Sequence, residues 1–161
     1  MLKRWLGIAA LLILCDQLTK LAISSHFVPG EALRITDFLN LVLAHNTGAS
    51  FSMLSHAGGW QRWLFSAIAA IASVWIVWLL RKHAQQKLFC IALAFILAGA
   101  MGNLIDRLLL GYVVDFLDFH WNDSHFAAFN VADTSINIGA ALLIWDGFKT
   151  KSEKANGTVT R

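Results

Sequence analysis

The sequence predicts an all-α integral membrane protein with four transmembrane helices, a small extracytoplasmic β element and an interfacial loop or helix. Three observations lead to this prediction. Hydrophobic residues make up 57% of the 161 residues and charged residues only 14%, which does not suit a soluble globule. Four stretches are long enough to cross a bilayer, which takes about 20 apolar residues. One segment outside them shows the alternation of apolar residues that is typical of strands.

The expected spans cover residues 5–23, 60–80, 88–108 and 130–148. We assign them to a single membrane domain over residues 1–149, followed by a polar cytoplasmic tail over residues 150–161. The first span has only Lys3 and Arg4 ahead of it and no small-residue cleavage pattern, so we expect it to remain as a span. The link over residues 81–87 is short, which predicts an antiparallel hairpin of the second and third spans.

The basic residues predict the orientation of the spans, because cytoplasmic loops carry an excess of Lys and Arg. The loops on the extracytoplasmic side carry Arg34, with Arg62 near a helix end. Both termini are therefore expected in the cytoplasm. This asymmetry also accounts for the net charge of +3, so we expect no nucleic-acid partner. The basic residues of the cytoplasmic side are Lys3, Arg4, Arg81, Lys82, Lys87, Lys149, Lys151, Lys154 and Arg161.

Two segments are expected on the outer side of the membrane. In the longer one, over residues 26–59, the alternating residues Leu39, Leu41 and Leu43 follow a similar pair, Leu33 and Ile35. This alternation predicts short strands that form a β element at the membrane surface. The shorter segment, over residues 111–129, mixes Asp with Phe and Trp, a composition that favours an interfacial position.

Charged and amide side chains occur inside the apolar spans, where they are costly. A central Asp, Lys or Arg costs about 2.5–3.5 kcal/mol even on the lenient insertion scale, so such residues commonly have a function. Helical spacing places Asp16 and Lys20 on one face, where they can pair. The third span carries a stripe of Gly99, Asn103 and Asp106 or Arg107, and the fourth carries Asn130, Asp133 and Asn137.

The predicted orientation places these polar residues at one level. The first and third spans run outward and the fourth runs inward, so their polar residues reach the outer half of the bilayer. The sequence therefore predicts one polar site that faces the extracytoplasmic leaflet. The residues expected there are Lys20, Asn103, Arg107, Asp115 and Asp133.

Each of these residues also has a structural interpretation that the sequence leaves open. The pair in the first span can serve packing alone, and Arg107 can reach lipid headgroups or pair with a neighbouring Asp. Asn130 and Asp133 can cap the fourth helix. Asp115 can be an exposed loop carboxylate, and Gly99 can simply allow close helix packing. The outer histidines show no metal-ligand spacing, so we expect no metal and no other cofactor.

Asp115 and Asp133 would support a definite chemistry if folding brings them together. Two carboxyl groups in a low-dielectric site share one proton, because it is unfavourable for both to be ionised at the same time. The carboxylate can activate water while the carboxylic acid donates to a carbonyl oxygen, which is aspartic-protease chemistry. Neighbouring amides and an arginine can orient the peptide or stabilise developing charge; the candidates are Asn46, Asn103, Asn130 and Arg107.

Five motif blocks of the chain resemble those of the lipoprotein signal peptidases, also called signal peptidase II. They are DQLTK (16–20), NTGASF (46–51), GAMGNLIDR (99–107), GYVVDF (111–116) and FNVAD (129–133), in the order found in the family. Any one block alone is weak, whereas five in order are highly specific. Two departures are Ala98, where many members have a second glycine, and Thr19 in place of a frequent serine. Neither changes the polar positions.

The resemblance implies an aspartic endopeptidase of the bacterial inner membrane that cleaves diacylglyceryl-modified prolipoproteins just before the lipidated cysteine. It implies a periplasmic β-cradle on four transmembrane helices and a catalytic pair of Asp115 and Asp133. We expect prolipoproteins and membrane lipids as partners and, because the site is self-contained, a monomer. The residues implied to support the site or contact substrate are Asp16, Lys20, Asn46, Gly99, Asn103, Arg107 and Asn130.

Two other classes of protein fit parts of the sequence. A transporter or channel also places charges in spans, but it more often shows inverted repeats or broken helices, and the inner halves of these spans are almost wholly apolar. A Ser–Lys protease would use Lys20 with Ser24 or Ser25. No oxyanion-hole pattern accompanies these serines.

Overall fold

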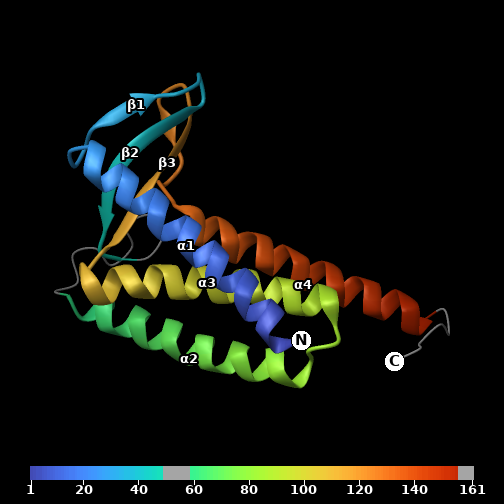
Figure 1. Cartoon of the computed structure of the whole chain (residues 1–161). Coiled ribbons are helices and arrows are strands. Elements are labelled where there is room, and N and C mark those ends of the chain that lie inside the picture. The colour runs from blue at the N-terminus through green and yellow to red at the C-terminus, as the bar shows by residue number, and fades with distance from the viewer. Residues whose placement is uncertain (49–58, 156–161) are drawn as a thin grey trace.

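A computed structural model of the chain describes residues 1–48 and 59–155, with side chains as far as Lys151. The helices are α1 (Leu2–His26), α2 (Trp60–Lys82), α3 (Lys87–Leu109) and α4 (Val131–Ala155). The strands are β1 (Ala32–Arg34), β2 (Leu39–Asn46), β3 (Val113–Trp121) and β4 (Ser124–His125). Figure 1 shows the sheet at one end of the helices, where α1 ends and α4 begins.

The helices occupy the four expected spans. Within the described residues, α1, α2 and α3 are each long and apolar enough to cross a membrane by length and composition. Helix α4 is 25 residues long, but polar residues such as Asp133, Asn137 and Asp146 interrupt its apolar sequence. It also continues to Ala155, so the expected polar tail begins as part of this helix.

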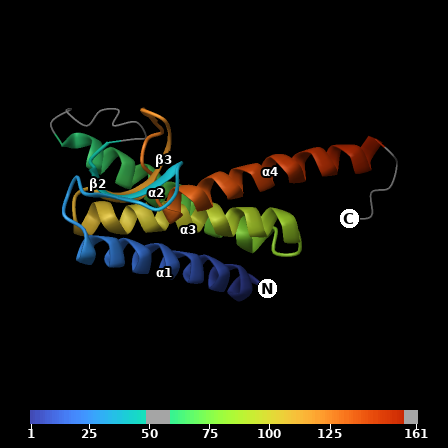
Figure 2. The ribbon, with the colours of Figure 1, turned by 90° about the horizontal axis from the view of Figure 1, so that it is seen from above.

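Helix α3 is the central helix of the bundle. It packs against α1, α2 and α4, and Figure 2 shows it between α1 and α4. Its buried face is rich in small residues such as Ala94 and Ala98, which let neighbouring helices come close. By contrast, α1 and α2 expose large apolar side chains such as Leu21 and Ile71. Extended apolar surfaces of this kind mark contact with lipid.

Glycines fix how closely α4 approaches α3. A Cβ atom at Gly99 would collide with the backbone carbonyl oxygen of Ala132 in the first turn of α4. A Cβ atom at Gly139 would lie 2.7 Å from the carbonyl oxygen of Ala92. The structural interpretation of Gly99, close helix packing, is therefore confirmed, and this packing places the beginning of α4.

The sheet is antiparallel with the strand order β1-β2-β3-β4. Strands β1 and β2 lie where the alternating leucines predicted them, and Leu33 pairs with Leu41. The register between β2 and β3 shifts between Leu41 and Ala44, and Ala44 then pairs with Asp115. Such a shift bends the strand and redirects side chains, and is common beside functional sites.

Residues 111–129, expected as an interfacial segment, differ from that expectation in one respect. They contribute β3, whose first four residues are buried. The reason is that Val113, Val114 and Phe116 suit a buried strand, and that Val113 and Val114 pair with residues of β2, more than sixty positions earlier in the chain. Local composition does not reveal a pairing of this kind.

Candidate active site

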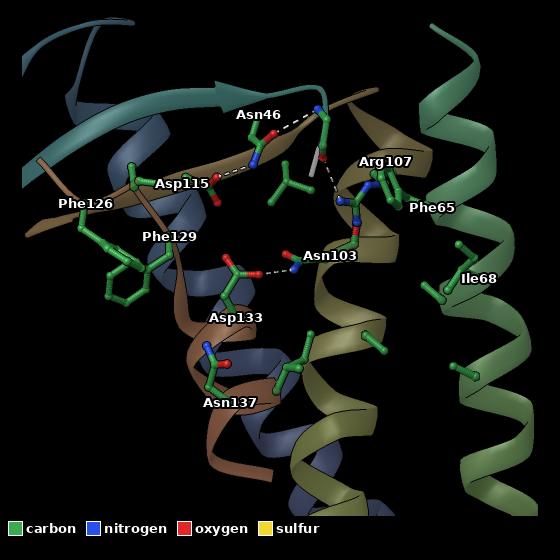
Figure 3. A pocket seen from close by; sticks show the side chains of 18 residues that line it. Asn46, Phe65, Ile68, Asn103, Arg107, Asp115, Phe126, Phe129, Asp133 and Asn137 are labelled. Carbon is green, nitrogen blue, oxygen red and sulfur yellow. Dashed lines mark hydrogen bonds between the residues drawn. The ribbon is translucent and has the colours of Figure 1, made fainter. Parts of the chain in front are cut away.

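A cavity of about 540 Å³ lies where the sheet meets α2, α3 and α4. Asp115 and Asp133 both line it, and Figure 3 shows their carboxyl groups directed into the same space. The wall on the side of α2 is apolar and includes Phe65 and Ile68. The structure thus brings the two predicted carboxyl groups together. The polar and charged side chains of the lining are Asn46, Asn103, Arg107, Asp115, Asp133 and Asn137.

Asp115 lies on β3 and is only 3% exposed. Its two carboxyl oxygens accept hydrogen bonds from Asn46 Nδ2 at 2.9 Å and from Asn130 Nδ2 at 2.7 Å. Burial, and next the negative charge of Asp133, raise the pKa of Asp115 to about 7, against the opposing effect of these two amides and of Lys20. The interpretation of Asp115 as an exposed loop carboxylate is therefore wrong.

Hydrogen bonds with Asn130 at the beginning of α4 fix the position of the Asp133 side chain. Asn130 Oδ1 accepts the backbone N–H of Asp133 at 2.9 Å, and Asp133 Oδ2 accepts the backbone N–H of Asn130 at 3.2 Å. This reciprocal pair is a capping box, which satisfies two backbone donors that a helix start leaves free. The structural interpretation of both residues as caps is thus correct. The other oxygen, Asp133 Oδ1, accepts a hydrogen bond from Asn103 Nδ2 at 2.8 Å inside the cavity.

Asn130 connects the two aspartates, since it binds Asp115 through its amide nitrogen and Asp133 through its amide oxygen. It is fully buried, and the same nitrogen contacts Asn103 Oδ1 at 3.3 Å. Because Lys20 Nζ also donates to that Asn103 oxygen, at 3.1 Å, the amide nitrogen of Asn103 must face Asp133. The neighbours therefore fix the orientation of both amides.

A buried ionic cluster lies behind the cavity and consists of Asp16, Lys20 and Asp106. Lys20 Nζ lies 2.9 Å from Asp16 Oδ2 and 2.9 Å from Asp106 Oδ2. With the bond to Asn103, all three ammonium protons have acceptors. The expected pair of Asp16 and Lys20 is thus formed, but a second helix completes it.

The carboxylates of Asp16 and Asp106 also accept hydrogen bonds from the backbone of α4 and β3, the elements that carry Asp133 and Asp115. Asp16 Oδ1 accepts the N–H of Ala132, in the first turn of α4, at 2.8 Å. Asp106 Oδ2 accepts the N–H of Val114, the residue before Asp115, at 3.1 Å. A negative charge at a helix N-terminus is stabilising. The cluster therefore ties α1 and α3 to the backbone beside each catalytic candidate.

Arg107 and Asn46 line the part of the cavity next to Gly48. The Arg107 guanidinium lies 5.4 Å from the centre of the Phe65 ring and 3.5 Å from the carbonyl oxygen of Gly48. Its alternative partner, Asp106, pairs with Lys20 instead. Asn46 Oδ1 accepts the N–H of Gly48 at 3.0 Å, so Asn46 both shapes a turn and binds Asp115. Residues 49–51 of the second motif block lie outside the described residues.

Lys20 and the serines do not form the alternative Ser–Lys pair. Lys20 is only 3% exposed and is surrounded by its own cluster. The hydroxyl of Ser25 donates to the carbonyl oxygen of Ala22 at 2.9 Å, and Ser24 is exposed on the last turns of α1. The geometry therefore gives no support to a serine nucleophile.

Sequence reasoning did not select Gln17 or Asn137 for the site. Gln17 donates to Asp106 Oδ1 at 2.9 Å and to the carbonyl oxygen of Gly102 at 3.3 Å, and so completes the buried cluster. Asn137 lines the cavity one helical turn after Asp133, as Figure 3 shows. Both had a signal, because Gln17 lies in the first motif block and Asn137 in the polar stripe of the fourth span.

No group of three or more His, Cys, Asp or Glu side chains that would hold a metal ion occurs in residues 1–48 and 59–151. The expectation of a metal-free site stays a prediction. Of the other supporting residues, Asp16, Lys20, Gly99 and Asn130 lie outside the cavity lining. They act on the site through the residues that they hold in place.

A family model described as signal peptidase (SPase) II matches residues 8–149 of the chain. The lipoprotein signal peptidase of Ralstonia nicotianae is 61% identical over 142 residues, which cover 88% of this chain and 82% of that protein. The lipoprotein signal peptidase of Paraburkholderia phymatum is 56% identical over 145 residues, which cover 90% of this chain and 87% of that protein.

Two solved structures of bacterial membrane enzymes share the fold. One has a TM-score of 0.85 at 33% identity and covers 94% of this chain and 92% of its own chain. The other has a TM-score of 0.78 at 34% identity, with 89% and 92% covered. Together with the family match and the five motif blocks, these similarities show that the chain belongs to the signal peptidase II family, the lipoprotein signal peptidases.

Proposed function

We propose that this enzyme is an aspartic endopeptidase that removes the signal peptide from diacylglyceryl-modified prolipoproteins, cutting just before the lipidated cysteine. The family supports the substrate class, because its members are named lipoprotein signal peptidases. The observation that carries the catalytic assignment is that Asp115 and Asp133 line one cavity and are joined through Asn130.

In the proposed reaction Asp115 holds the shared proton and Asp133 is the base. The pKa of Asp115 of about 7 supports this assignment. Asp133 lies in the first turn of α4 and accepts hydrogen bonds from the backbone N–H of Asn130 and from Asn103 Nδ2, which favours its negative charge. Asp133 removes a proton from water as the water oxygen attacks the scissile carbonyl carbon. Asp115 donates its proton to the carbonyl oxygen, which gives a neutral tetrahedral diol.

Collapse of this diol completes the cycle. The C–N bond breaks, the proton on Asp133 passes to the leaving nitrogen, and a hydroxyl proton of the diol returns to Asp115. The products are the free carboxyl group of the signal peptide and the amino group of the lipidated cysteine. Amide and guanidinium groups of Asn46, Asn103 and Arg107 lie where they can orient the peptide.

The lining of the cavity suits a lipidated peptide. Apolar residues of α2 and the aromatic rings of Phe126 and Phe129 face the polar side chains across the cavity. Buried acyl chains contribute about 0.8 kcal/mol per CH₂, so an unlipidated precursor is expected to be a very poor substrate. Asn137 lines the cavity one helical turn after Asp133. Its amide is placed to form hydrogen bonds with the backbone of the signal peptide.

The orientation in the membrane belongs to the same proposal. We place the enzyme in the bacterial inner membrane as a monomer, with α4 as a fourth span, both termini in the cytoplasm and the cavity toward the periplasmic leaflet. Support comes from the excess of basic residues at the end of the bundle away from the cavity, among them Arg81 and Lys82. Such an excess marks the cytoplasmic side.

The proposal is tested by cleavage of a lipidated prolipoprotein with the purified enzyme, in the presence and absence of a metal chelator. We expect Asp115→Asn and Asp133→Asn each to abolish cleavage, because the change keeps the shape but removes the titrating group. Cleavage by the unmodified enzyme is expected to be insensitive to the chelator.

Asp118→Asn is the matched control. Asp118 lies on the same strand, is 7% exposed and stays outside the cavity lining, where it binds Asn40 and His125. This variant is expected to cleave at nearly the unmodified rate. Substantial turnover by either Asp115→Asn or Asp133→Asn, or loss of turnover with the chelator, contradicts the two-aspartate mechanism.

A further inference from the structure

A second hollow lies between α1, α2 and α3, away from the catalytic cavity. This α1–α2 groove has a volume of about 570 Å³, within the range of about 300–1,000 Å³ that is usual for ligand cavities. Its walls are apolar and include Leu6, Ile13, Val77 and Met101. The groove shares no lining residue with the catalytic cavity.

One hydroxyl group in this groove lacks a partner. Ser73 is 7% exposed and lines the groove, and its Oγ atom is buried without any hydrogen bond. A serine within a helix commonly bonds back to a carbonyl group of the preceding turn, but this one does not. Buried polar side chains nearly always have a partner, so this hydroxyl is an unsatisfied polar group in the packing of α2 beside the groove.

Positive charge lies at one end of the same groove. Arg81 is the only charged residue of the lining, and in the part of the chain that the structure describes it makes no ion pair or hydrogen bond. The next residue, Lys82, holds its ammonium 5.0 Å from the centre of the Trp78 ring, which also lines the groove. Ser73 and Arg81 are eight residues apart on α2, about 12 Å along the helix axis.

We propose that the α1–α2 groove binds an anionic phospholipid. One acyl chain fills the apolar walls, and the phosphate pairs with Arg81 and Lys82 at the end of the groove. The charge decides between the occupants that a membrane offers. The headgroup of a zwitterionic lipid would bring its own cation to two basic residues, and a signal peptide would bring its positively charged N-terminal region there.

Such a lipid would join two helices that otherwise meet little. Helix α1 packs mainly on α3 rather than on α2, and α1 carries Asp16 and Lys20 of the buried cluster. An occupant of the groove therefore stabilises the position of α1. The inference does not depend on the proposed protease activity, because the two cavities are separate.

The test uses the full-length protein in nanodiscs of phosphatidylcholine, with or without phosphatidylglycerol. Native mass spectrometry reports the lipid that stays bound, and thermal unfolding reports the stabilisation. We expect the unmodified protein to retain phosphatidylglycerol in preference to phosphatidylcholine and to unfold at a higher temperature when it is present. Arg81→Gln removes the charge that pairs with the phosphate and is expected to lose both effects. Because Arg81 is exposed, its replacement leaves the core intact.

Three further variants test whether the effect belongs to the groove. Lys87→Gln removes a basic residue at the same end that does not line the groove, and is expected to behave like the unmodified protein. Ala10→Phe fills the groove and is expected to exclude the lipid, whereas Leu11→Phe, at an exposed position outside the groove, is expected to retain it. Equal retention of the two lipids overturns the proposal, as does a synthetic signal peptide that displaces the lipid.

Discussion

Asn130 is the residue on which the geometry of the site depends most directly. Its amide nitrogen binds Asp115, its amide oxygen caps α4, and its backbone N–H binds Asp133. A single side chain thus sets the position of one carboxyl group and the helix start that carries the other. The cap and the contact with Asp115 are made by the two ends of one amide group, so a structural interpretation of Asn130 does not exclude the proposed functional one.

Asn130→Ser separates these two functions. Serine caps a helix about as well as asparagine, so the temperature of unfolding is expected to stay close to that of the unmodified enzyme. Serine does not reach Asp115 as the amide does, and leaving a buried polar group without its partner costs about 1–3 kcal/mol. Cleavage of the lipidated precursor is expected to slow accordingly. If Asn130→Ser unfolds early and cleaves normally per folded molecule, the contact with Asp115 has no catalytic value.

Asn46→Ala tests a second contact with Asp115. The amide of Asn46 stabilises the carboxylate and lowers the pKa of Asp115 against the effect of burial, so its removal is expected to raise that pKa further. We expect a loss of about 1–3 kcal/mol in turnover, with the alkaline limit of the pH profile moved upward. A parallel loss of stability and activity with an unmoved pH profile would show that Asn46 only shapes the turn at Gly48.

At the scale of the elements, the beginning of α4 is the point where the fold and the site meet. Gly99 lets this helix start approach α3, and Asp16 accepts the N–H of Ala132. Asp106 holds the backbone of β3 in the same cluster. Four elements therefore converge on one lysine, Lys20, which pairs with both carboxylates.

Lys20→Met tests this convergence. The substitution leaves Asp16 and Asp106 buried without their cation, and breaking a buried ion pair in this way costs about 3–5 kcal/mol. We expect a large fall in the temperature of unfolding and loss of cleavage. Lys3→Met, at an exposed position on the first turn of α1, is the control and is expected to change neither. An unchanged unfolding temperature for Lys20→Met contradicts the role of the cluster in holding α4.

At the scale of the whole molecule, the pH dependence combines stability with activity. Burial in the assembled fold raises the pKa of Asp115 from 3.8 to about 7. The folded protein therefore binds this proton more tightly than the unfolded chain does. The stabilisation is complete below the unfolded pKa and is lost as the pH rises through about 7.

We therefore expect cleavage to fall as the pH rises above about 7, because Asp115 then lacks the proton that the carbonyl oxygen receives. Unfolding of the unmodified enzyme and of Asp115→Asn, measured between acid and neutral pH, checks the stability part. The advantage of the unmodified enzyme is expected to shrink toward neutral pH, since the asparagine variant has no proton to lose. An alkaline optimum, with full activity well above neutral pH, contradicts the assignment of the proton to Asp115.

The sequence by itself determined the apolar helices, the alternation that gives β1 and β2, and the five motif blocks that identify the family. These are local properties, since hydrophobicity, period and motif are each contained in one short stretch. For the same reason the sequence identified Asp115 and Asp133 as candidates. It left open whether Asn130 caps or catalyses, because a local pattern fits both.

Only the tertiary structure decided which of these stretches contact one another and through which groups. The N–H of Ala132 and the carboxylate of Asp16 that accepts it are 116 residues apart. The strand β3 exists because β2 pairs with it, and Lys20 finds Asp106 and Asn103 on a different helix. The groove with Ser73 and Arg81 is likewise formed by three helices. Buried polar groups must find partners wherever the fold provides them, and those partners become visible only when the helices are packed.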